Sequence, residues 1–164
     1  MLTLLTRTKK KSDMNEITSI VYLSRAGVEF SKRDARQHLK IFSQTENAKH
    51  EISGLLVYSE GYFLQIIEGT SAAIDTLYAK IVRDPRHSEI DLLTRSVSAI
   101  RLFSKWSMGI VETEDSLETN INIDNRLAAI EILRKRLTTE SISASTFIEV
   151  FLDPQSIGVE YKIA

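Results

Sequence analysis

The sequence predicts an α+β fold of the ferredoxin-like class, with the element order β-α-β-β-α-β-β, followed by two C-terminal helices. Short β-branched runs alternate with amphipathic stretches in this order up to about residue 112. Helical apolar spacing returns after about residue 123. The 164 residues are 43% hydrophobic and 26% charged, which suits one folded domain with a modest appendage. We therefore expect a mixed sheet that carries two helices on one face.

The first strand is expected over residues 16–25, because EITSIVYLSR is β-branched and apolar on both alternations. A helix is expected over about 31–46, where Ser31 and Asp34 form an S-x-x-D start signal. Its apolar stripe is Ala35, Leu39 and Phe42.

A hairpin is expected next, from strands at 52–59 and 62–69 joined at Glu60-Gly61, because glycine accepts the positive φ of a tight turn. Thr70 or Ser71 can cap a second helix that stops at Asp84-Pro85. Two weaker strands are expected near 90–97 and 107–112.

After about residue 113 the polar stretch TEDSLETN is typical of a linker. Asp124 can cap a helix whose last turn is basic, and a strongly apolar helix is expected at about 143–152, from Ser143 to Asp153-Pro154. Such an apolar helix needs burial, so the pair must cover either the back of the sheet or another subunit. The residues that carry this inference are Leu127, Ile130, Leu133, Leu137, Phe147, Ile148, Val150, Phe151 and Leu152.

These patterns divide the chain into a flexible tail at 1–14, a folded domain at 15–112 and a linker with helical extension at 113–164. The formal net charge of −1 gives no general attraction to nucleic acid or to an anionic membrane. No apolar run is long enough to span a membrane, and the order of charge and apolar residues at the start is not that of a secretory signal. We therefore expect a cytoplasmic protein with neither a nucleic-acid nor a membrane partner.

Most common catalytic patterns are missing. The chain has no cysteine, which excludes thiol chemistry and disulfides, and it has no glycine-rich phosphate loop and no G-x-S-x-G elbow. His38, His50 and His87 are too scattered to indicate a metal site, although His87 is the strongest candidate for a functional role. The sequence also shows no pair of carboxylates of the kind used in acid–base catalysis.

Three polar residues stand out against this background. Gln65 lies in the middle of the apolar run F-L-Q-I-I, and Tyr22 lies mid-strand in I-V-Y-L. A buried amide or phenol needs hydrogen-bond partners, which could be backbone groups at a sheet edge or each other. Asn47 closes the first helix and could simply be its C-terminal cap. Together they favour a pocket for a planar heterocycle with donors and acceptors along one edge, such as a flavin.

Several motifs in combination resemble the BLUF (blue light using flavin) photoreceptor domains. The resemblance covers about residues 16–112. The matching stretches are I-V-Y-L-S at 20–24, I-S-G-L-L-V-Y at 52–58, F-L-Q-I-I-E-G at 63–69, R-D-P-R-H at 83–87 and F-S-K-W-S-M at 103–108.

The resemblance implies four photoactive residues at the flavin, namely Tyr22, Gln65, Trp106 and Met108. Tyr22 aligns with the family's tyrosine that gives an electron and then a proton to the excited flavin. Gln65 aligns with the glutamine that rearranges its hydrogen bonds and leaves the flavin slightly red-shifted. The family's tryptophan and methionine, whose placement varies, fall on Trp106 and Met108.

The resemblance also implies a cofactor site. The residues that would hold the flavin are Tyr22, Asn47, Gln65, Lys80, Arg86, His87 and Met108. FAD is the implied form, with FMN or riboflavin as alternatives, bound without a covalent link. Glu46 departs from the asparagine or histidine of several relatives, and Lys80 lacks the planar fork of an arginine.

These observations favour a photosensory module that is not an enzyme. The alternatives are a light-insensitive flavin-binding or interaction module of the same fold and, less favoured, a flavin-dependent enzyme. Because no effector motif is present, we expect the signal to pass to an unidentified protein partner and the chain to form a homo-oligomer.

Overall fold

A five-stranded mixed sheet forms the centre of the computed structural model, which describes residues 16–105, 107–112, 123–137 and 142–157. The strand order is β4-β1-β3-β2-β5, and every neighbouring pair is antiparallel except β2 and β5. The strands are β1 (Ile17–Ala26), β2 (Ser53–Ser59), β3 (Tyr62–Gly69), β4 (His87–Ser98) and β5 (Gly109–Glu112).

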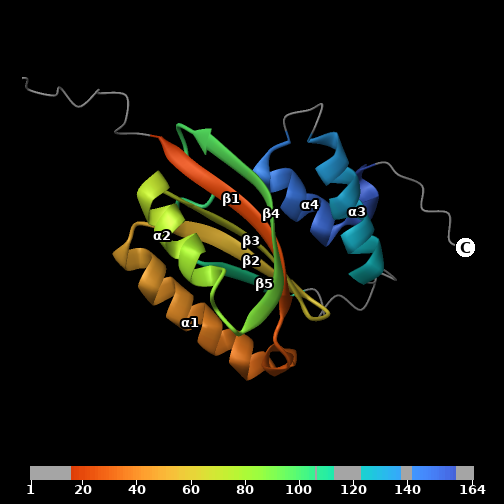
Figure 1. Cartoon of the computed structure of the whole chain (residues 1–164), viewed down its shortest axis with the longest axis horizontal. Helices are drawn as coiled ribbons and strands as arrows, with labels where there is room; N and C mark the ends of the chain where they lie inside the picture. Colours follow the sequence, from red (N-terminus) through yellow and green to blue (C-terminus); the bar gives the residue numbers. More distant parts are fainter. Residues whose placement is uncertain (1–15, 106, 113–122, 138–141, 158–164) are drawn as a thin grey trace, which may run out of the picture.

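Two helices cover each face of this sheet (Figure 1). One face carries α1 (Arg33–Lys49) and α2 (Ser71–Ile81), and the other carries α3 (Ile123–Arg136) and α4 (Ala144–Leu152). Short 3-10 turns at Val28–Ser31 and Pro154–Ile157 precede α1 and follow α4. The ferredoxin-like α+β arrangement is confirmed, and so is the first alternative for the C-terminal helices, which cover the back of the sheet.

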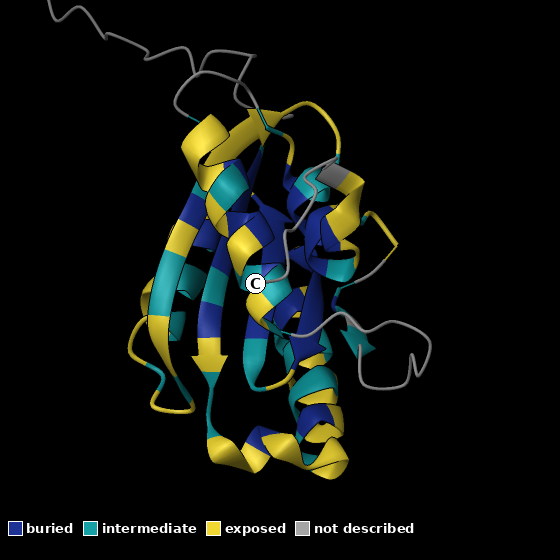
Figure 2. Ribbon diagram, turned by 90° about the vertical axis from the view of Figure 1, so that its right-hand side faces the viewer, coloured by how far each residue is buried: buried dark blue, intermediate teal, exposed yellow. Residues whose placement is uncertain are grey.

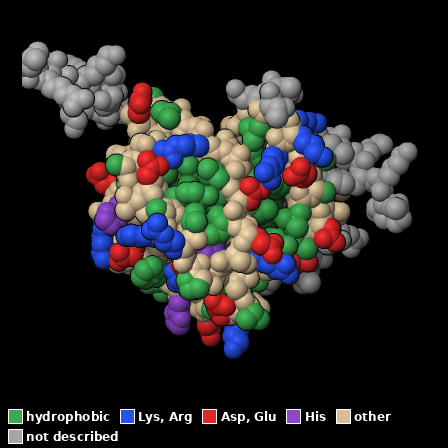
Figure 3. Space-filling view, viewed as in Figure 1, with side chains coloured by type: hydrophobic (Ala, Val, Ile, Leu, Met, Phe, Trp, Pro, Cys, Tyr) green, Lys and Arg blue, Asp and Glu red, His purple; other side chains and the backbone are tan. Residues whose placement is uncertain are grey.

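The two faces have separate hydrophobic cores because successive residues of a strand point to opposite sides. On β1, Val21 belongs to the core beneath α3 and α4, whereas Ile20 lies in the core beneath α1 and α2. Figure 2 shows the buried residues gathered between the sheet and the helices, with exposed residues on the outer helix surfaces. Charged side chains of both signs are spread over the face seen in Figure 3, and hydrophobic side chains gather in hollows toward its centre.

The strand predictions agree with the structure to within a few residues, and the hairpin is confirmed. Glu60 and Gly61 both have positive φ, 43° and 85°, which is the pattern of the two-residue turns that match the twist of a hairpin. Thr70 caps α2 as expected, since its side chain accepts from the Ala73 N–H. Ser143 likewise caps α4 by accepting from the Thr146 N–H.

Several helix ends were predicted wrongly. Ser31 does not cap α1, because its hydroxyl donates to Val28 O within the preceding 3-10 turn and the helix starts at Arg33. Asn47 is not a terminal cap either, since α1 continues to Lys49.

The other two differences concern α2 and α3. α2 ends at Ile81, and the chain turns before it reaches Asp84-Pro85. Asp124 lies within the first turn of α3 rather than at its cap.

Some expectations fall outside the described residues, namely the tail at 1–14, Trp106 and the linker TEDSLETN that follows residue 112. Among the helices that the structure does describe, none has the length and apolar character needed to cross a membrane.

Candidate functional site

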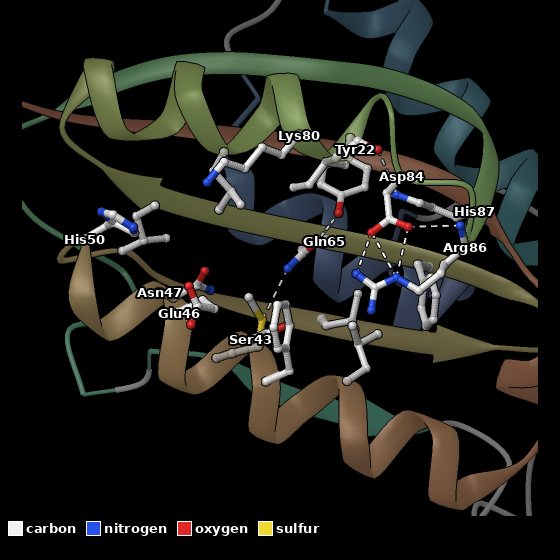
Figure 4. A pocket seen from close by; sticks show the side chains of 18 of the residues that line it. Tyr22, Ser43, Glu46, Asn47, His50, Gln65, Lys80, Asp84, Arg86 and His87 are labelled. Atoms are coloured by element: carbon white, nitrogen blue, oxygen red, sulfur yellow. Dashed lines mark hydrogen bonds and ion pairs between the residues drawn. The ribbon is translucent and has the colours of Figure 1, made fainter.

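A cavity of about 510 Å³ lies between α1, α2 and the sheet, a size typical of sites for small organic ligands. Figure 4 shows polar side chains reaching it from both helices and from the central strands. Its walls are largely apolar, with Leu39 on α1, Leu77 on α2 and Phe63 on β3. A planar apolar ligand with a polar edge fits this combination.

The centre of the site is a hydrogen-bonded pair on adjacent strands. Tyr22 on β1 and Gln65 on β3 are register partners, so their side chains project from the same face of the sheet. The Tyr22 hydroxyl donates to Gln65 Oε1. The Gln65 Nε2 group donates to the Met108 sulfur at 3.3 Å, and thioether sulfur is a weak acceptor. The Gln65 amide is therefore held firmly at its oxygen and weakly at its nitrogen.

Tyr22 is surrounded by rings and nearly removed from solvent. Only 3% of the residue is exposed, and the rings of Tyr78 and His87 lie 5.9 and 6.3 Å from its own, centroid to centroid. Burial, with smaller effects of Tyr78 and Asp84, raises the pKa of Tyr22 far above its usual value. The phenol is therefore protonated at any physiological pH and remains a hydrogen-bond donor.

Asn47 connects α1 to the segment that precedes β5. It is buried in the last turn of α1, and its Nδ2 group donates to Ser107 O at 3.0 Å. One turn earlier, Gln44 Nε2 donates to Met108 O at 2.9 Å. The Asn47 side chain also lines the cavity, where its Oδ1 atom can accept a hydrogen bond from a ligand.

Charged residues gather at the rim beyond the end of α2. Arg86 is held by Asp84 through Nε, with N–O distances of 2.9 and 3.0 Å, and its guanidinium lies over the Phe42 ring. This pairing raises the pKa of Arg86 and lowers that of Asp84. Lys80 also lines the cavity and is exposed to solvent.

His87 is held by the protein through both ring nitrogens. Nδ1 lies 3.0 Å from Ser24 Oγ, and Nε2 lies 3.1 Å from Ile81 O. A carbonyl only accepts, so Nε2 carries the proton of the neutral ring and Nδ1 accepts from the serine. Burial lowers the pKa of His87, although Asp84 partly opposes this effect.

The structure thus brings together at one cavity seven of the residues identified from the sequence: Tyr22, Asn47, Gln65, Lys80, Arg86, His87 and Met108. Trp106 lies outside the described residues. Sequence reasoning does not identify Tyr78, which packs on Tyr22, or Asp84, which holds Arg86. Within the described part of the chain, no three His, Cys, Asp or Glu side chains are grouped as a metal site would require.

Comparison with protein families gives one match that covers more than half of the chain. The model of the BLUF family, described as sensors of blue light using FAD, matches residues 17–109.

Curated relatives match a shorter part of the sequence. The photoactivated adenylate cyclase subunit alpha of Euglena gracilis is 40% identical over 62 residues, which are 38% of this chain and 6% of the cyclase subunit. The blue light- and temperature-regulated antirepressor BluF of Escherichia coli (strain K12) is 24% identical over 96 residues, 58% of this chain and 24% of the antirepressor. The chain therefore spans only a small part of the length of these relatives.

Solved structures match the fold over most of the chain. A bacterial light-regulated adenylyl cyclase is 26% identical with a TM-score of 0.62, covering 82% of this chain and 39% of the cyclase. BlrB, a BLUF protein solved in its dark state, is 27% identical with a TM-score of 0.58, covering 89% of this chain and 99% of BlrB. The likeness to BlrB extends beyond the segment that the family model matches.

Proposed function

The chain belongs to the BLUF family of sensors of blue light that use FAD, and we propose that its signal begins at the hydrogen bonds of Tyr22 and Gln65. The observation that carries this proposal is the Tyr22–Gln65 pair at the cavity, with the weakly held Nε2 group of Gln65 beside Met108.

The residues at the cavity fit a flavin. The isoalloxazine ring is planar and apolar on its faces, and Leu39 on α1 and Leu77 on α2 offer apolar contact to it from the cavity walls. Its polar edge needs both donors and acceptors, which the amides of Asn47 and Gln65 supply. The chain has no cysteine, so we expect binding by hydrogen bonds and apolar contact alone. Lys80 and Arg86 would hold the polar end of the cofactor, whereas His87, bonded through both ring nitrogens, would hold the turn beside it.

Each of the two central residues has a separate task in this proposal. When bound, the flavin absorbs blue light and becomes a strong oxidant. Tyr22 is the phenol bonded to the amide, and it would supply an electron and then its hydroxyl proton; both would return to it after Gln65 has exchanged its hydrogen bonds, which leaves the flavin oxidised and the tyrosine neutral. Losing that proton removes the donor that holds Gln65 Oε1 in place.

Gln65 then exchanges its hydrogen bonds. An amide has a donor and an acceptor at similar positions, so a half-turn of the group swaps one for the other. The cost is low on the nitrogen side because the bond that breaks there is to a thioether sulfur. The new arrangement places a donor where an acceptor was, which changes the hydrogen bonding at the cofactor edge without covalent change.

We propose that the C-terminal helices α3 and α4 pass the light signal on. α3 and α4 pack on the sheet face opposite the cavity, and the segment carrying Met108 leads into β5 and then toward α3. A shift of this segment would change how the helices dock and so change a surface for a partner protein or a second copy. The relatives named above include a light-regulated cyclase and an antirepressor, which supports an effector or partner downstream.

In this proposal the chain itself is a sensor rather than an enzyme, with a flavin-binding unit at 15–112 and an output extension at 113–164. Its cytoplasmic location and its oligomeric state stay predictions.

Two measurements on the purified protein test the proposal. The protein should be yellow, and denaturation should release free FAD, FMN or riboflavin that chromatography identifies. Blue light should then shift the absorbance slightly to the red, and the shift should reverse in the dark. A folded but colourless protein would contradict the flavin site, and a coloured protein without a shift would instead favour the light-insensitive alternative.

A further inference from the structure

A buried carboxylate on β3 has no part in the mechanism above. Only 1% of Glu68 is exposed. It is the register partner of Ser19 on β1 and of Ser53 on β2, so the three side chains form a row across the central strands. Alternation along β3 places Glu68 on the same face as Ile66, which is the α3–α4 face rather than the cavity face.

The Glu68 side chain holds the segment that joins β4 to β5. Its Oε2 atom accepts from the Leu102 N–H at 2.9 Å, and its Oε1 atom accepts from the Phe103 N–H at 2.6 Å. Ser53 Oγ donates to Oε1 at 3.0 Å. Hydrogen bonds from backbone amides to a carboxylate are among the stronger ones, and a buried carboxylate without them is costly. These two amides are therefore fixed to the sheet.

Arg101 strengthens this attachment at the preceding residue. Its guanidinium donates to Ser53 Oγ and to the Glu68 carbonyl, both at 2.9 Å, and to Glu51 O at 2.6 Å. Segment 101–103 is thus tied to the end of β3 and to the start of β2.

The other end of the segment lies in the photoactive site. Met108 is buried in the core of the cavity face, with its sulfur 3.3 Å from Gln65 Nε2. Phe103, by contrast, packs against the core beneath α3 and α4. Only four residues of chain therefore separate Met108, beside the switching amide, from Phe103, beneath the output helices.

The geometry points to Glu68 as a positioning residue that couples the two faces, by holding Phe103 on the α3–α4 core while Met108 stays beside Gln65. This inference rests on the proposed function, since it names the connection between the Gln65 switch and the helices. Because the main chain at Leu102 and Phe103 is fixed at Glu68, a displacement of Met108 turns the segment about this point and so changes how the Phe103 side chain packs on the α3–α4 core. Without this attachment, the chain between Phe103 and Met108 changes its own conformation, and the packing of Phe103 stays as it was.

The test is amide hydrogen exchange on the flavin-loaded full chain, in the dark and under blue light, for wild type and Glu68→Gln. Glutamine keeps the shape but gives up one of the two acceptor oxygens. In the dark, exchange should become about tenfold faster at whichever of the Leu102 and Phe103 amides loses its acceptor oxygen, as expected for the loss of one such hydrogen bond. Under light, the red-shifted photoproduct should still form, because Tyr22 and Gln65 are unchanged. The light-induced change in exchange in α3 and α4 should be lost.

Two further variants make the result specific. Ser19→Ala removes only a hydroxyl that lies 3.5 Å from Glu68 Oε2, so it should keep the helix response. Glu68→Asp keeps the charge but is one methylene shorter, so it weakens the bonds to the Leu102 and Phe103 amides and decides the question by the same criteria if Glu68→Gln does not fold.

The possible failures can be told apart. A normal photoproduct with a wild-type helix response in Glu68→Gln would overturn the role of Glu68 alone. A purely structural role would destabilise the dark state and leave the light-induced difference in α3 and α4 intact, which would also overturn it. A wild-type protein without any photoproduct would overturn the proposed function itself.

Discussion

The two faces of the five-stranded sheet are packed differently, because one is filled by side chains and the other borders a cavity. On the α3–α4 face, large apolar side chains such as Phe147 and Phe151 are completely buried and fill the space above the strands. On the α1–α2 face, apolar packing stops at a cavity of about 510 Å³, and the polar residues Tyr22, Gln65 and Asn47 surround it. One face therefore supplies stability from the chain alone, and the other is completed by its ligand.

The largest difference between the faces should appear on truncating a side chain of the filled core. Phe147→Ala should lower the free energy of unfolding by about 3–5 kcal/mol, because it opens a cavity in a packed core. Leu39→Ala on the cavity wall should cost about 1–2 kcal/mol, since this side chain is only partly buried and already borders empty space. Urea unfolding of the flavin-free proteins measures both, and equal losses would contradict the distinction.

Removing the cofactor should weaken one face more than the other. At a free flavin concentration 100 times the dissociation constant, binding should add about 2.7 kcal/mol to the free energy of unfolding. In the flavin-free protein, amide exchange should increase in α1 and α2 and change little in α3 and α4. A uniform increase over both helix pairs would show that the cavity face is not a separate unit.

High pH should destabilise the cavity face through Tyr22. In the unfolded chain this phenol ionises near its usual pKa of 10.0, whereas burial raises its pKa in the folded protein, so the unfolded state loses its proton first. The free energy of unfolding should therefore fall as the pH rises above about 10, by up to about 1.4 kcal/mol per pH unit. Tyr22→Phe should reduce this slope and leave the smaller contribution of Tyr78. An unchanged slope in the variant would show that Tyr22 is not the group responsible.

The smallest effects should come from surface ion pairs, and these should be alike on the two faces. Arg95 pairs with Asp75 of α2 at 2.7 Å, and Arg134 of α3 pairs with Asp91 at 2.5 Å. All four side chains are partly exposed, so Arg95→Ala and Arg134→Ala should each cost about 0–1 kcal/mol. A much larger loss for either would mean that charge, and not core packing, distinguishes the faces.

The strands and the order of elements could be predicted because their signals are local. The runs that form β1, β2 and β3 are β-branched and apolar, and Gly61 marks the hairpin. Where a helix begins depends on the conformation of the residues before it, and a sequence pattern does not show that conformation directly. A 3-10 turn at Val28–Ser31 uses the Ser31 hydroxyl before α1 starts, so the S-x-x-D pattern is misleading there.

The photoactive pair could be predicted in part for a similar reason. Tyr22 and Gln65 are polar residues within apolar runs, which a single sequence shows directly. Their contact depends on the β1–β3 register between residues 43 positions apart, which the sequence does not show. Glu68 comes directly after the apolar run that contains Gln65. The sequence alone therefore indicates that Glu68 is buried. Its partners, Leu102 and Phe103, are set by the path of a loop and could not be predicted.

The measurement that tests the central claim most directly is the light-minus-dark absorbance spectrum of Gln65→Leu beside Gln44→Leu. Both variants remove an amide that contacts Met108, but only Gln65 also bonds Tyr22. We expect both proteins to bind flavin, Gln44→Leu to form the red-shifted photoproduct, and Gln65→Leu to form none. A shift of wild-type size in Gln65→Leu would contradict the claim that this amide is the switch.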